Sequence, residues 1–154
     1  MYSNLGNFND EMLNQSTALN DVSNTYKAFV EAIIPRTPRL AVIYGRIQYY
    51  GALDLYTDEY VIMSLNSLLI PLAIPVAEII NVAAAQLVYS TGENRLQNYS
   101  RASTWELFFE LLPIERLQAI SLLLLRNVSL IEIPVPFQNN QGNILSITML
   151  LIRL

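Results

Sequence analysis

One long stretch almost without charge constrains what this chain can fold into. Between Glu59 and Glu93 the only charged residue is Glu78. Two successive apolar segments fill this stretch, and exposing that much apolar surface to water is unfavourable. The segments must therefore be covered by the rest of the protein, by a partner or by lipid.

Both segments have apolar residues at helical spacing, and prolines separate them. Thr57 is a good N-cap for the first helix, and Pro71 is expected to end it. Pro75 suits the first position of the second helix, which should stop at Gly92. The apolar positions expected on the first helix are Val61, Leu65, Leu68 and Leu69.

The same stretch is apolar enough to raise the question of whether it spans a membrane. A spanning helix needs about 20 consecutive apolar residues. Here Pro71, Pro75 and Glu78 interrupt the run. The sequence therefore favours a helical hairpin buried in the protein over a pair of transmembrane helices.

The N-terminal part predicts an arm followed by a helix. Residues 1–15 are rich in asparagine, which favours turns over helix, so we expect a flexible polar arm there. A helix should run from about Thr17 to Ile34, where Pro35 ends it. Residues 16–154 are expected to form one helical domain.

The C-terminal part predicts further helices around one extended segment. Ser103 and Glu106 form a capping box, and Pro113 suits the start of the helix after that. Residues 128–137 contain two prolines and should be extended. Residues 144–154 fit a helix or a strand. The sequence thus predicts an all-α, single-domain bundle of about six helices with an extended, proline-containing segment near the C-terminus.

Composition argues against several kinds of function. The chain has no cysteine and no histidine. Disulfides, thiolate zinc sites, cysteine nucleophiles and Ser-His-Asp catalysis are therefore excluded, and the helical di-metal pattern lacks its histidines. We expect no catalytic residue, no cofactor and no metal. The net charge of −4 argues against nucleic acid, which needs a basic field.

Composition also suggests association with protein. Charged residues make up 14% of the chain, against about 25% in a typical domain. We infer that part of the apolar surface is buried against a protein partner or another copy of the chain. The N-terminus shows no export signal, so a cytoplasmic location is the expectation by default.

One region is the candidate interaction surface. Tyrosine gives a large contact area with a polar tip, and arginine stacks on aromatic rings. Such a surface could bind a protein or a small molecule, or the tyrosines could simply cap the edge of the core. The candidate residues are Arg36, Arg39, Tyr44, Arg46, Tyr49, Tyr50, Tyr56 and Tyr60.

Glu78 is a candidate buried acid, because it is the lone charge in an apolar stretch. Burial without a partner would raise its pKa, as in a functional acid. The alternative is a first-turn glutamate stabilised by the helix N-terminus or by an arginine.

Two pieces of sequence resemble the gluconate 2-dehydrogenase subunit 3 family. The first is Phe29 to Thr37 (Phe-Val-Glu-Ala-Ile-Ile-Pro-Arg-Thr), and the second is Gly51 to Asp54 (Gly-Ala-Leu-Asp), before Tyr60 and Val61 on the next helix. The resemblance implies a small helical subunit that accompanies a flavin-dependent, membrane-associated dehydrogenase and holds no cofactor of its own.

The sequence therefore predicts a non-catalytic helical accessory or interaction subunit. The resemblance implies that this subunit could belong to a flavin-dependent dehydrogenase-type complex. The first alternative is a self-assembling structural protein. The second is a histidine-free enzyme or small-ligand binder that uses Glu78.

Overall fold

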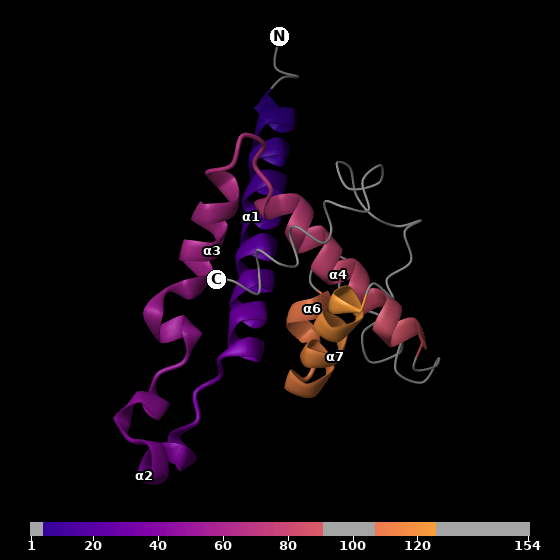
Figure 1. Ribbon diagram of the computed structural model, residues 1–154. Helices are drawn as coiled ribbons and strands as arrows, with labels where there is room; N and C mark the ends of the chain where they lie inside the picture. The colour runs from indigo at the N-terminus through magenta and orange to yellow at the C-terminus, as the bar shows by residue number, and fades with distance from the viewer. Residues whose placement is uncertain (1–4, 91–106, 126–154) are drawn as a thin grey trace.

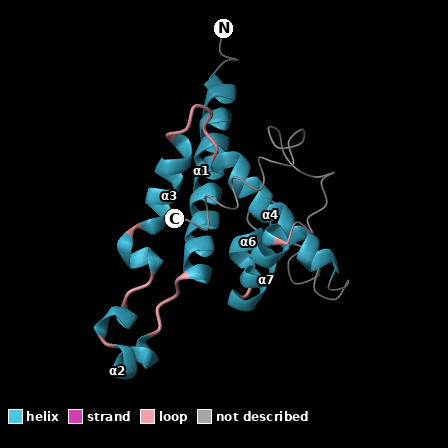
Figure 2. Cartoon of the chain, viewed as in Figure 1, coloured by secondary structure: helices cyan, strands magenta, loops and turns pink. Residues whose placement is uncertain are grey.

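The chain folds into helices joined by short connections. The computed structural model describes residues 5–90 and 107–125, and every regular element within them is helical (Figures 1 and 2). The predicted all-α class is thereby confirmed. The predicted capping box, the extended proline segment and the final element lie outside the described residues.

The longest helix, α1 (Leu5–Ile33), runs along the body of the protein and contacts α3, α4, α6 and α7. It begins earlier than the predicted start near Thr17, so most of the expected flexible arm is helical. Leu5, Phe8 and Met12 recur there at helical spacing, and this pattern outweighs the weak preference of asparagine for turns.

Four short helical segments follow α1 and precede α3. Each is no longer than four residues, so none could be stable without tertiary contacts. They are η1 (Pro38–Leu40), α2 (Ala41–Tyr44), η2 (Arg46–Tyr49) and η3 (Ala52–Leu55).

Helix α3 (Thr57–Asn66) is shorter than the sequence suggests. Its N-cap is Tyr56, in a left-handed conformation with φ of 53°, rather than Thr57. Leu68 and Leu69, expected on the helix, lie in the turn after it. Two hydrogen bonds close this turn. The Leu72 N–H donates to the Leu65 carbonyl (3.2 Å), and the Ala73 N–H donates to Asn66 Oδ1 (3.3 Å).

Helix α4 (Ala73–Ser90) is the central helix, with nine buried residues. Ala83 and Ala84 are fully buried, and α4 packs against α1 and α7. Among the described residues, α4 alone is long and apolar enough to cross a membrane, and half of it is buried inside the protein.

Two further helices, α6 (Leu107–Glu110) and α7 (Pro113–Leu124), cover α4. Pro113 occupies the first helical position, as predicted. The Glu115 carboxylate accepts a hydrogen bond from the Leu112 N–H (3.0 Å) and caps the start of α7. Arg116 ties the helices together, donating to Glu31 Oε2 (3.1 Å) and the Phe109 carbonyl (2.7 Å).

A buried amide, Asn81, joins three helices in the core. Its Nδ2 group donates to Thr25 Oγ1 on α1 (3.1 Å) and to the Ala77 carbonyl on α4 (3.0 Å). Its Oδ1 accepts from the Phe108 N–H on α6 (3.0 Å). Nearby, the buried Tyr26 hydroxyl donates to the Ala73 carbonyl (2.7 Å), and burial raises the pKa of this hydroxyl.

Replacing Asn81 with alanine should destabilise the fold. The Phe108 N–H would be left buried without a partner, which costs roughly 1–3 kcal/mol. Urea unfolding of the whole chain measures the change. Ser90→Ala is the control, because Ser90 is exposed and its hydroxyl donates to the Leu87 carbonyl within its own turn, so its effect should stay below about 0.5 kcal/mol. Equal effects for the two variants would contradict the role of Asn81.

Candidate interaction surface

Residues 38–50, which we call the tip, project from one end of the protein (Figure 1). None of the residues in η1, α2 or η2 is buried. Val42 is 93% exposed, and the other large apolar side chains of the tip are also exposed. They are Leu40, Ile43, Tyr44, Ile47, Tyr49 and Tyr50. The tip therefore has no core of its own, and burial of its apolar side chains cannot be what holds its shape.

Backbone hydrogen bonds hold the two ends of the tip together. Residues 34–37 and 51–54, which we call the base of the tip, lie on either side of it. The Ala52 N–H donates to the Ile34 carbonyl (3.0 Å), and the Thr37 N–H donates to the Gln48 carbonyl (3.0 Å). The Thr37 hydroxyl also bonds the Gln48 side-chain oxygen. These contacts close the loop and leave its apolar side chains facing outward.

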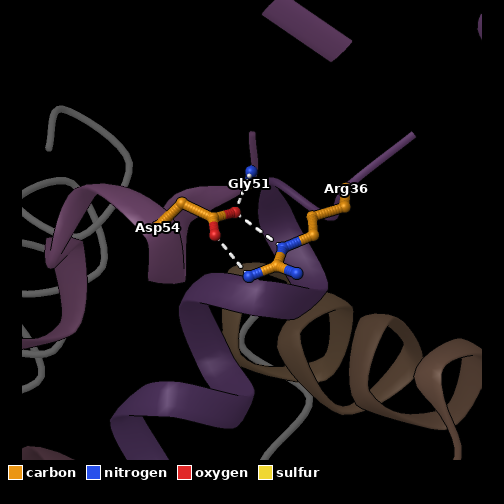
Figure 3. Close-up of polar contacts among 3 residues, drawn as sticks. All are labelled: Arg36, Gly51 and Asp54. Carbon is orange, nitrogen blue, oxygen red and sulfur yellow. Dashed lines mark hydrogen bonds and ion pairs between the residues drawn. The ribbon is translucent and has the colours of Figure 1, made fainter. Parts of the chain in front are cut away.

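An ion pair reinforces the base (Figure 3). Arg36 Nε donates to Asp54 Oδ2 (2.6 Å), and a second guanidinium nitrogen bonds Asp54 Oδ1. The Gly51 N–H donates to the same carboxylate (2.8 Å). The Gly51 hydrogen bond, together with Arg36, lowers the pKa of Asp54 below its ordinary value.

Close backbone packing explains the glycine at position 51. A Cβ atom there would lie 2.9 Å from the Arg36 backbone nitrogen and 3.0 Å from the Ile34 carbonyl oxygen. Both are main-chain atoms and cannot move aside easily. Only glycine lets the two segments of the base approach this closely.

The predicted interaction residues divide between the tip and its surroundings. Five of them lie in the tip: Arg39, Tyr44, Arg46, Tyr49 and Tyr50. Arg36 belongs to the base, where its guanidinium group is engaged by Asp54. Tyr56 and Tyr60 follow the base, at the start of α3, and both are exposed.

The charge of the tip is entirely positive. Residues 32–53 contain three arginines and no acidic residue, although the whole chain has a net charge of −4. Arg36 is paired with Asp54, whereas Arg39 and Arg46 form no ion pair within the part of the chain that the structure describes. Among the residues that the structure describes, the tip therefore offers two arginines outside any ion pair around an apolar centre.

Glu78 lies on α4, apart from the tip, and is partly buried. It lies beyond the first turn, because α4 begins at Ala73, so the expected first-turn position is wrong. Partial burial raises the pKa of its carboxyl group. No hydrogen-bond or ion-pair partner contacts this carboxylate among the described residues. The described residues also contain no group of acidic side chains that could hold a metal ion.

The sequence does not predict that Arg36, Gly51 and Asp54 come together in the base. From the sequence, Arg36 is a candidate interaction residue beside the tyrosines, and Gly51 and Asp54 enter only through the family resemblance. One feature of the sequence does point to the base: the two pieces that resemble the family, residues 29–37 and 51–54, flank the tip on both sides. In the structure these pieces meet, through Ile34 with Ala52 and Arg36 with Asp54.

Comparisons with known proteins returned no family model, no curated protein and no solved structure that matches this chain.

Replacing Asp54 with asparagine should weaken the base in a pH-dependent way. The pKa of Asp54 is lowered in the folded state, so its charge stabilises the fold above the ordinary carboxyl value of 3.8. That contribution is lost as the pH falls through the lower, folded pKa. Thermal unfolding should show the wild type melting above Asp54→Asn at neutral pH, with the gap closing in acid.

The Arg36→Gln background serves as the control for this effect. Without the guanidinium partner, Asp54→Asn should lower the melting temperature by less. A gap that stays constant with pH, or that is unchanged in the Arg36→Gln background, would contradict an ion pair at the base.

Proposed function

We propose that this chain is a non-catalytic helical accessory subunit that docks onto a protein partner through its tip. The observation that carries the proposal is the tip itself, a segment held in a defined shape with all its large apolar side chains exposed. Leaving Val42 and its neighbours in water is unfavourable unless a partner covers them.

The chemistry of the tip matches that of protein interfaces. Tyrosine and arginine are enriched in interfaces and among the residues that dominate their binding energy. The tip combines Tyr44, Tyr49 and Tyr50 with two arginines, Arg39 and Arg46, that form no ion pair with any described residue. A partner that fits would present an apolar patch beside acidic groups.

Preorganisation also supports docking. A loop that must be ordered on binding loses conformational entropy, which weakens association. Here the bonds between residues 34 and 52, 37 and 48, and 36 and 54 hold the loop before any partner arrives. A role in recognition would explain a base built to fix an exposed segment.

The resemblance to gluconate 2-dehydrogenase subunit 3 suggests the class of partner. The two resembling pieces form the base of the tip, so the likeness falls on the part of the chain that would present the docking surface. On this basis we take a flavin-dependent dehydrogenase subunit as the proposed partner. The absence of histidine and cysteine supports a role without catalysis.

Val42→Asp should remove docking without unfolding the protein, because Val42 is 93% exposed. Burying one valine contributes roughly 1.5–3 kcal/mol, so affinity should fall at least about tenfold. A tagged chain expressed in its own cells should co-purify a flavoprotein, identified by flavin absorbance and mass spectrometry, and Val42→Asp should lose it.

The matched control is Ile114→Asp, which places the same charge at an exposed apolar position on α7. It should retain the flavoprotein. Retention by Val42→Asp, or equal loss with Ile114→Asp, would contradict docking through the tip. Capture of a partner without flavin would contradict the dehydrogenase assignment and leave the docking surface in place.

A further inference from the structure

Two of the residues that the structure describes have a positive φ, and their side chains differ greatly in size. They are Gly45 in the tip and Tyr56 just after the base. Glycine adopts the φ of 88° at position 45 without strain, because it has no Cβ atom. At Tyr56, φ is 53° and ψ is 34°, a left-handed conformation that strains a bulky side chain. Glycine would therefore be the less strained residue at position 56.

The connection between η3 and α3 imposes this conformation. Tyr56 ends η3, since its N–H donates to the Leu53 carbonyl (3.3 Å), and it caps α3, since its carbonyl accepts from the Tyr60 N–H (3.1 Å). On one side Asp54 holds the chain to the base, and on the other the buried Val61 holds α3 in the core. The left-handed turn is thus forced on the residue that stands between two fixed elements.

The Tyr56 side chain gives the fold little in return for this strain. It is 68% exposed, and it forms no hydrogen bond or ring contact with any described residue. Strained residues of this kind cluster at functional sites, where the side chain is needed for another purpose. An exposed tyrosine at a strained position therefore points to a role outside the chain itself.

We infer that the Tyr56 ring contacts the same protein partner that docks on the tip. The inference rests on the proposed function and extends the docking surface beyond residues 38–50. Tyr56 follows Asp54 of the base by two residues, so their Cα atoms lie within about 7 Å of each other. The base that fixes the tip thus also fixes the place of this ring. Tyrosine is among the residues that dominate the binding energy of protein interfaces.

The exposed residues that follow Tyr56 on α3 have the same chemistry. Tyr60 is 59% exposed and Met63 is 71% exposed, and the three residues recur at the spacing of successive helical turns. Tyrosine and methionine are both enriched in protein interfaces. Glu59 is also exposed here, whereas the tip is basic. A fitting partner would be apolar opposite Tyr56 and neutral or basic opposite Glu59.

Tyr56→Gly separates a role in binding from a role in folding, because the two measurements should move in opposite directions. Relief of the strain should raise the melting temperature of the free chain by about 2–4 °C. Loss of the ring should weaken partner binding at least about tenfold. The probe is the flavoprotein that the wild-type chain captures and Val42→Asp loses, purified and titrated against each variant by bio-layer interferometry.

Three further variants complete the test. Tyr56→Asn should act like Tyr56→Gly, because asparagine also tolerates the left-handed conformation. Tyr56→Phe keeps both the ring and the strain, so it should keep the wild-type melting temperature and lose much less affinity. Tyr89→Ala removes a ring that is 67% exposed at the end of α4, and it should leave partner binding unchanged.

Several outcomes would overturn the inference. They are unchanged binding in Tyr56→Gly, a melting temperature that falls in this variant, and an equal loss of binding in Tyr89→Ala. The proposed function fails separately. If Val42→Asp loses the flavoprotein and Tyr56→Gly keeps it, docking through the tip stands and the Tyr56 contact is wrong. If capture does not depend on Val42, the proposed function is wrong and the Tyr56 contact is overturned with it.

Discussion

The arrangement of the helices depends on one buried amide. Asn81 bonds α1 through Thr25 and α6 through Phe108, while it also bonds a carbonyl of its own helix. An unpaired amide in this core would cost free energy, so the three helices are favoured only at the positions that satisfy it. The end of α1 is thereby fixed, and the tip projects from that end.

Different forces hold the body and the tip. The body is held by a core of buried apolar side chains around α4. The tip has no such core and is held by backbone bonds and by Asp54, which accepts from Arg36 and Gly51. This division frees the apolar side chains of the tip for contact with another molecule.

Local signals in the sequence predicted the helical class and several boundaries. Pro113 starts α7 as expected, because proline loses nothing where the first N–H has no partner. The base could not be derived in this way, since Arg36 and Asp54 meet only when a loop of many residues closes. The hydrogen bonds of Asn81 to three helices could not be predicted from the sequence either, because a single amide near a run of alanines forms no periodic pattern. Leu69 was placed on a helix since its spacing fits, but side-chain and backbone bonds stop α3 earlier.

The hydrogen bonds and the ion pair of the base make the tip a preformed surface and not a loose loop. Amide hydrogen exchange of the free protein tests this most directly, at the Thr37 and Ala52 N–H groups that close the base. Both amides should exchange far more slowly than in an unstructured chain, although they lie next to an exposed segment. Exchange at the unstructured rate, with the core amides still protected, would show that the base does not hold the tip in place.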